Sequence, residues 1–166
     1  MEKKTSIQLL NQALAEELQA VHQYMYFHFH LNDQGLSPLA TLFKRTAIQE
    51  MGHAESLAER ILFLKGDVEM ATAGPVEKIL DPKEMLAKGA AMEEGSAKFY
   101  NRAALECSAG LDAGSKEVFE HLVGDEEGHF SQFEQQREHI ERFGLSYLAL
   151  QSFGGGTPKV DAEPAE

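Results

Sequence analysis

The amino-acid sequence predicts an all-α protein, a four-helix bundle made of two antiparallel helix hairpins, with one long crossover between them and a short fifth helix at the end. Three observations lead to this prediction. Apolar residues recur every three or four positions along four long segments, which is the period of one face of an α-helix. Gly and Pro residues separate these segments. No sustained alternation of polar and apolar residues indicates a β-strand.

The first hairpin occupies the N-terminal part of the chain. Its first helix is expected from Thr5 to about Asn32, where Gly35 ends it. Ser37-Pro38 has the composition of an N-cap followed by a first-turn proline, and the second helix is expected to reach about Lys65, where Gly66 provides a C-terminal stop. Because the link between them is short, the two helices should pack antiparallel.

A long connection and a second hairpin follow. Residues 67–80 contain Gly74-Pro75 and no sustained period, and they are numerous enough to cross from one end of a bundle to the other. Asp81-Pro82 again resembles a cap and first-turn proline, so a third helix is expected to about Ala109. After a tight turn over residues 110–114, the fourth helix is expected from Ser115 to about Phe143.

The C-terminal part divides into two. Residues 145–153 are apolar enough for a short fifth helix, which we expect to pack on the outside of the bundle or on another subunit. We assign residues 1–153 to one domain, the bundle with its fifth helix. The remaining residues, 154–166, contain Gly and Pro and are predicted to be a flexible tail.

Composition narrows the range of functions. The formal net charge of −12 argues against nucleic acid and anionic membranes as partners, and it favours attraction of cations. The single cysteine, Cys107, excludes an internal disulfide framework and a Cys-rich zinc or rubredoxin-type site. The sequence has neither a signal peptide pattern nor a transmembrane run, so we expect a cytoplasmic protein.

An internal repeat directs carboxylates and imidazoles into the predicted core. The motif Glu-x-Gly-His occurs at 50–53 and recurs at 126–129. The same shift along the chain relates Glu17 to Glu93, so both precede their motifs by an equal interval, and each is followed by a tyrosine two helical turns later. The repeat alone does not exclude a pair shifted by one residue, but the heptad phase favours this one. The predicted site residues are Glu17, Glu50, His53, Glu93, Glu126 and His129.

This set of residue types suits two divalent metal ions. Buried carboxylates are too costly to keep charged without a partner, and four negative charges balance two dications. Glu50 and Glu126 would bridge the ions, Glu17 and Glu93 would each cap one, and each histidine would complete one. Oxygen-rich ligands with one nitrogen per ion favour iron or manganese over structural zinc. The alternative for the same residues is a salt-bridge network in the core.

Over residues 3–153 the sequence resembles the bacterioferritins, haem-binding members of the ferritin-like di-iron proteins. The motifs are Glu17 with Gln23-Tyr24, the run from Glu50 to Glu55, the run from Glu59 to Leu64, and Asp125-Glu126-Glu127-Gly128-His129. The resemblance implies a 24-subunit cage built from dimers, with two iron ions per subunit. It implies that Fe²⁺ is oxidised with O₂ or H₂O₂ and that a ferric mineral is stored inside. It also implies iron release through a small ferredoxin.

The resemblance gives Met51 a role as well. In that family the methionine after the first motif glutamate binds haem b shared between two subunits, and here this residue is Met51. A turn of 100° per residue takes Met51 off the core-facing side of its helix, as an interface ligand requires. Two features depart from the family pattern. Gly52 lies in a helix interior, and Trp is absent.

Other functions compete with iron storage. A small di-iron oxidase or peroxidase without a cage, resembling rubrerythrin, would keep the same site, but no Cys-x-x-Cys electron-transfer domain is present. A DNA-protecting mini-ferritin shell builds its iron site between subunits and lacks the twin Glu-x-x-His motif. The two tyrosines, Tyr24 and Tyr100, are expected beside the site or in the core. Five histidines have no predicted role: His22, His28, His30, His121 and His139.

Overall fold

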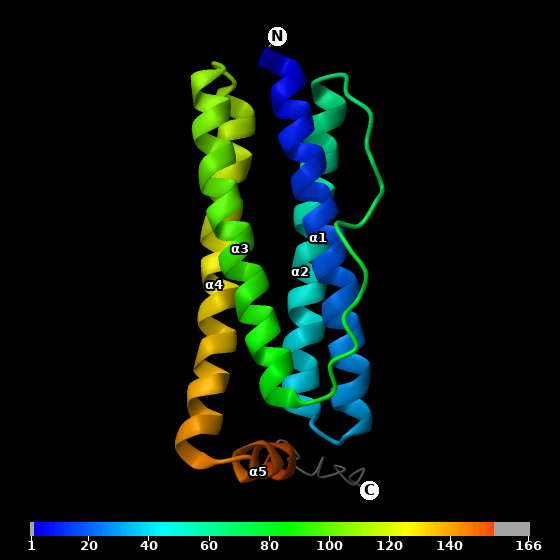
Figure 1. Cartoon of the computed structure of the whole chain (residues 1–166), viewed down its shortest axis with the longest axis vertical. Helices are drawn as coiled ribbons and strands as arrows, with labels where there is room; N and C mark the ends of the chain where they lie inside the picture. Colours follow the sequence, from blue (N-terminus) through cyan, green and yellow to red (C-terminus); the bar gives the residue numbers. More distant parts are fainter. Residues whose placement is uncertain (1, 155–166) are drawn as a thin grey trace, which may run out of the picture.

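The computed structural model describes residues 2–154, which form five helices and no strand. The helices are α1 (Glu2–Asp33), α2 (Ser37–Phe63), α3 (Pro82–Ala109), α4 (Ala113–Phe143) and α5 (Ser146–Gly154). The predicted all-α bundle with a short fifth helix is confirmed (Figure 1). The predicted flexible tail lies outside the described residues, apart from Gly154, which ends α5. Within residues 2–154, no helix has the combined length and apolar character needed to cross a bilayer.

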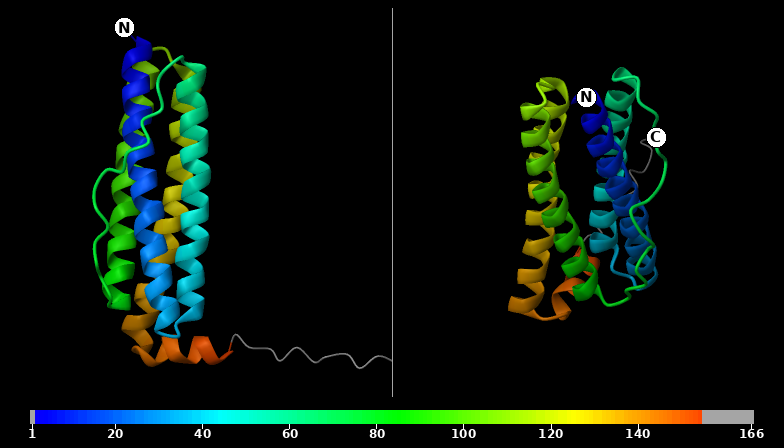
Figure 2. Two further views of the ribbon diagram at one scale, coloured as in Figure 1. Left: turned by 90° about the vertical axis from the view of Figure 1, so that its right-hand side faces the viewer. Right: turned by 45° about the horizontal axis from the view of Figure 1, so that its top comes forward.

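The four long helices pair as two antiparallel hairpins, α1 with α2 and α3 with α4, and the crossover runs along the outside of α1 (Figures 1 and 2). Three side-chain amides of α1 hold this crossover. Each amide oxygen accepts a backbone N–H of the crossover, and each amide nitrogen donates to one of its carbonyls, at 2.8–3.1 Å. The contacts join Asn11 to Asp67 and Glu69, Gln19 to Gly74 and Pro75, and Gln23 to Glu77.

The boundary between α1 and α2 differs from the prediction in one respect. Gly35 has a φ of 76°, which glycine adopts without a steric penalty, so it follows the end of α1 as expected. However, Ser37 is not the N-cap. That position is held by Leu36, whose side chain makes no capping hydrogen bond, and the helix begins at Ser37 with Pro38 in its first turn.

The end of α2 also differs. The helix ends at Phe63, slightly earlier than predicted, and Lys65 takes the left-handed conformation (φ 65°) that a glycine usually provides. Gly66 is required for a different reason. A Cβ at this position would lie 2.8 Å from the side chain of Ile7 and 3.0 Å from that of Ile61, so close approach to α1 requires glycine here.

The second hairpin begins each helix with an aspartate cap. Asp81 accepts the backbone N–H groups of Lys83 and Glu84 at 2.9 and 3.0 Å, as predicted for the start of α3. In the turn before α4, Asp112 accepts the backbone N–H of Ser115 at 3.1 Å. Because Asp112 is the cap, α4 begins at Ala113, slightly earlier than predicted.

The core consists of two apolar clusters separated by a polar layer. One cluster surrounds Leu57 and Phe119, and the other surrounds Phe43 and Phe133. The fifth helix lies across the end of the bundle beside the second cluster (Figure 2). We expected α5 to pack on the outside of the bundle or on another subunit, but its Leu148 is 4% exposed and belongs to that core cluster, so α5 also contributes to the core. The predicted site residues form the polar layer between the clusters.

Candidate di-metal centre

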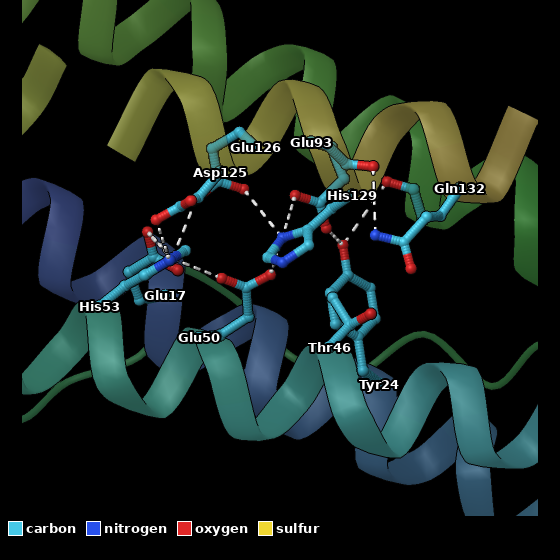
Figure 3. A network of polar contacts seen from close by, with 12 residues as sticks. Glu17, Tyr24, Thr46, Glu50, His53, Glu93, Asp125, Glu126, His129 and Gln132 are labelled. Carbon is cyan, nitrogen blue, oxygen red and sulfur yellow. Dashed lines mark hydrogen bonds and ion pairs between the residues drawn. The ribbon is translucent and has the colours of Figure 1, made fainter. Parts of the chain in front are cut away.

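The six predicted site residues converge in the middle of the bundle, from all four long helices (Figure 3). None is more than 8% exposed. Their ligand atoms form two overlapping groups, each with all its atoms within 4.8 Å of one another. One group is Glu17, Glu50, His53 and Glu126, and the other is Glu50, Glu93, Glu126 and His129. The sequence repeat therefore becomes two half-sites that share two carboxylates.

Glu50 and Glu126 each direct one oxygen to each half of the cluster. Glu50 Oε2 lies 2.7 Å from His53 Nδ1, and Glu50 Oε1 lies 2.9 Å from His129 Nδ1. Glu126 Oε1 lies 3.2 Å from His53 Nδ1, and Glu126 Oε2 lies 3.8 Å from His129 Nδ1. Glu17 lies 3.7 Å from His53 Nδ1 and Glu93 lies 3.4 Å from His129 Nδ1, so each approaches one half only. This is the arrangement expected of two bridging and two terminal carboxylates.

The polar atoms of the cluster are not satisfied by the protein. Among residues 2–154, six buried side-chain nitrogen or oxygen atoms make no hydrogen bond of normal geometry, and all six belong to this cluster. They are both oxygens of Glu50, Glu93 Oε2, Glu126 Oε1, and the Nδ1 atoms of His53 and His129. Buried polar groups without partners are rare in folded proteins because their desolvation is not compensated. Atoms of this kind, converging on one place, indicate a ligand.

Two tyrosines hold the terminal carboxylates from outside. Tyr100, in α3, donates its hydroxyl to Glu17 Oε1 at 2.5 Å, and Tyr24, in α1, donates to Glu93 Oε1. Both tyrosines are fully buried. The expectation that they lie beside the site is confirmed, and each restricts the carboxylate of the opposite hairpin.

The electrostatics of the cluster favour positive charge. Burial on its own lowers the pKa of His53 and His129, but the surrounding carboxylates outweigh it and raise both pKa values well above the usual range. Burial raises the pKa of Glu17 and of Glu93. Both effects mean that the cluster takes up positive charge, either as protons or as metal cations.

The donor set fits two metal ions. Ligand bonds of about 2.1 Å place two donors on one ion up to about 4.2 Å apart, and the donors of each group lie within 4.8 Å. Small side-chain movements therefore suffice. The donors are oxygens with one imidazole per group, which favours iron or manganese. Sulfur takes no part, because Cys107 is buried in the first apolar cluster, 3.8 Å from Ser6 Oγ.

One contact of the cluster was missed at the sequence level. His53 Nε2 lies 3.3 Å from Asp125 Oδ2, and the same oxygen lies 3.4 Å from His121 Nε2. The spacing of four between His121 and Asp125 indicates that they share a face of α4. The contact with His53 could not be read from the sequence, because it depends on the register of α4 against α2.

The methionine predicted to bind haem lies away from this cluster. Met51 is 57% exposed on the outer side of α2, one helical turn from Ile48, which is 56% exposed. Its orientation off the core is confirmed, and its role with haem stays a prediction. Within the described chain, a Cβ on Gly52 would meet no atom within 4 Å. No helix of the same subunit therefore explains this glycine.

A four-helix bundle with a carboxylate and histidine cluster between its hairpins defines the ferritin-like class, and residues 7–143 match the family described as a ferritin-like domain. The bacterioferritin of Rhodobacter capsulatus is 39% identical over 145 residues, which cover 87% of this chain and 89% of that protein. That of Brucella melitensis is 35% identical, with 83% and 86% covered. The chain belongs to the bacterioferritin family.

A solved structure agrees with this assignment. The X-ray structure of the Desulfovibrio desulfuricans bacterioferritin, which describes its diiron site in different catalytic states, has a TM-score of 0.89 to this chain. It is 32% identical, and the match covers 99% of this chain and 96% of that one. The fold therefore agrees over the crossover and α5 as well as over the bundle.

Proposed function

We propose that this protein stores iron and oxidises Fe²⁺ at the cluster between its hairpins. One observation carries the proposal. Glu50 and Glu126 each present one oxygen to each half of a buried site whose polar atoms lack other partners. Two ions held by these shared carboxylates would be close together, and two Fe²⁺ ions would supply the two electrons that reduce O₂ or H₂O₂.

Each group of the chain has a distinct task in this reaction. Glu17 and His53 would hold one ion, Glu93 and His129 the other, and the two shared glutamates would hold both. The four carboxylates match the charge of two Fe²⁺ ions, and the apolar clusters on either side limit the access of water. Tyr24 and Tyr100 keep the terminal carboxylates in place as the charge at the centre changes.

Membership of the family supports a further part of the proposal. We infer that the chain assembles into a 24-subunit cage built from dimers, and that haem b binds between two subunits through Met51 of each. The exposed position of Met51 and Ile48 supports an interface on this side of α2. A small ferredoxin would supply electrons through the haem for iron release.

The oxidation site is tested by removing one ligand at a time. Glu50→Ala and His129→Ala should each lower the initial rate of Fe²⁺ oxidation more than about 100-fold, since ligand loss exceeds the 10–100-fold typical of residues behind the ligands. Stopped-flow absorbance with O₂ and with H₂O₂ would measure the rate and identify the faster oxidant. Glu127→Ala, on the exposed side of α4, is the matched control. Unchanged rates in both ligand variants would contradict the site.

Assembly and haem are tested by light scattering during size-exclusion chromatography, with absorbance recorded at the Soret wavelength. A cage gives a particle with 24 times the subunit mass of 18.4 kDa. The Soret band should correspond to about half a haem per subunit and should be absent from Met51→Leu. A particle of only twice the subunit mass, without a Soret band, would leave the metal chemistry but exclude storage in a cage.

A further inference from the structure

The His53 ring connects the buried cluster to the surface between α2 and α4. Its Nδ1 atom faces Glu17, Glu50 and Glu126, whereas its Nε2 atom lies 3.3 Å from Asp125 Oδ2 (Figure 3). The Asp125 side chain is 42% exposed, compared with 10% for His53. One imidazole is therefore all that separates a solvent-accessible carboxylate from the centre.

A second imidazole approaches the same carboxylate from the solvent side. His121 Nε2 lies 3.4 Å from Asp125 Oδ2, one helical turn away on α4. A single carboxylate oxygen thus lies between one buried and one exposed histidine. Carboxylate and imidazole are both ligands of divalent first-row metals, and a pair on adjacent turns of one helix can bind the same ion.

The surface beside this pair is shaped to collect cations. A groove of about 540 Å³ is lined by His121 together with Glu117 and Glu120 of α4, and Ser56 of α2 forms part of its wall. Glu120 is paired with Lys116 at 2.8 Å, so the attraction for cations comes from Glu117, and negative charge in a concave surface raises the local concentration of cations. His121 lines this groove and also approaches Asp125, so it connects the groove to the carboxylate beside His53.

The other half of the centre lacks this series. The internal repeat pairs Asp125 with Gln49 and His121 with Arg45, and both of these residues are exposed on α2. An amide replaces the carboxylate, and a permanent positive charge replaces the imidazole. The internal repeat therefore does not account for the His121 and Asp125 pair, which occurs on the His53 side alone.

We propose that His121 and Asp125 form a transient Fe²⁺ binding position, from which the ion passes to the half-site of Glu17 and His53. This proposal rests on the proposed function, because the ion must have a centre to fill. The step is an exchange of ligands without electron transfer: Fe²⁺ leaves Asp125 and His121 and becomes bound by the buried carboxylates. His53 then completes the half-site through Nδ1, which already faces Glu17, Glu50 and Glu126.

The test uses Co²⁺, which binds like Fe²⁺ but is not oxidised by air under mild conditions, added to the full metal-free protein. The variants are Asp125→Asn, which keeps an acceptor for His53, and His121→Gln. Glu127→Gln removes one charge from the same helix and is the control. Stopped-flow absorbance measures how fast the centre fills at limiting Co²⁺, and equilibrium titration measures how many ions bind.

Wild-type protein should bind two Co²⁺ ions per subunit. Both variants should still bind two at saturation but fill about 10-fold more slowly, since the collecting ligands are lost, and the control should match wild type. Unchanged filling rates in both variants would overturn the proposal. Loss of one ion at saturation in Asp125→Asn would also overturn it, because Asp125 would then only position His53. A wild-type protein that binds no pair of ions would instead contradict the proposed function itself.

Discussion

The two hairpins, α1 with α2 and α3 with α4, contribute nearly the same residues to the buried carboxylate and histidine cluster, but their other residues differ. Each supplies one terminal glutamate, one shared glutamate, one histidine and one tyrosine, at equal spacings along the chain. Outside these ligands the copies diverge. His53 faces Asp125, but the repeat places Gln49 in the corresponding position beside the other half.

The same divergence occurs where α2 and α4 begin. The shift of the internal repeat pairs Leu36 with Asp112, and these are the N-cap residues of the two helices. Asp112 caps α4 with its side chain and contacts Arg60 at 2.5 Å, whereas Leu36 makes no capping hydrogen bond and packs against the second apolar cluster. Metal binding requires matched ligands in both halves, but stability can be supplied by polar contacts in one half and by packing in the other.

The largest effect on stability is expected from removing the negative charge of the Asp112 cap. Although partial burial works in the opposite direction, hydrogen bonds from Ser115, Ser6 and Arg60 lower the pKa of Asp112 to about 2, from an ordinary value of 3.8. This difference corresponds to about 2 kcal/mol. Asp112→Asn should therefore lower the free energy of unfolding by about 2 kcal/mol at pH 7, as measured by denaturant titration.

The pH dependence of that loss follows from the direction of the pKa shift. A lowered pKa in the folded state stabilises the protein above the unfolded value near 4, and the stabilisation disappears as the pH falls through the folded value near 2. The difference between wild type and Asp112→Asn should shrink over this window. A constant difference between pH 7 and pH 2 would show that the charge of Asp112 is not responsible.

A smaller effect, on metal affinity, is expected from substitution of the two tyrosines. These variants test whether the two half-sites bind their ions independently. Tyr24→Phe and Tyr100→Phe each remove the hydroxyl that holds one terminal glutamate. Loss of such a contact behind a metal ligand should lower the affinity for one of the two ions about 10-fold, which corresponds to about 1.4 kcal/mol of binding free energy. In each variant, titration with Co²⁺ should show that one ion binds with lower affinity and the other with unchanged affinity. Lower affinity for both ions in a single variant would mean that the two half-sites do not act separately.

The residues of the buried cluster could be predicted from the sequence because the helical period and the internal repeat constrain the same positions. Two independent patterns assign Glu17 and Glu93 to the core, and the structure places both at 2% exposure or less. Helix ends were less predictable. Lys65 adopts a left-handed conformation that its residue type does not favour, because the packing of Gly66 against α1 determines the chain path there.

Contacts between elements that are distant in sequence were the least predictable. Nothing local to Asp125 indicates that it faces His53, since this depends on how α4 lies against α2. For the same reason the sequence showed that α5 is apolar but not that Leu148 packs into the end of the bundle. Such contacts follow from the relative position of helices, and a single sequence does not encode that position in a local pattern.

The smallest effect concerns two glycines that the repeat places in corresponding positions, Gly52 and Gly128. Each lies in a helix interior, and a Cβ on either would meet no atom within 4 Å in the described chain. Alanine should stabilise each helix by about 1 kcal/mol, because glycine is a poorer helix former. Within one subunit the two substitutions are therefore equivalent, and any difference between them arises from contacts with other subunits.

Gly52 follows Met51, so an interface around a shared haem would cover it. We expect Gly128→Ala to raise the free energy of unfolding by about 1 kcal/mol, while Gly52→Ala gives no gain and lowers haem content, because the added methyl group meets the partner subunit. Thermal unfolding and the Soret absorbance of the assembled protein would measure both. Equal stabilisation by the two variants with unchanged haem would contradict an interface at Gly52. In that case Met51 would lose the structural support for its predicted role.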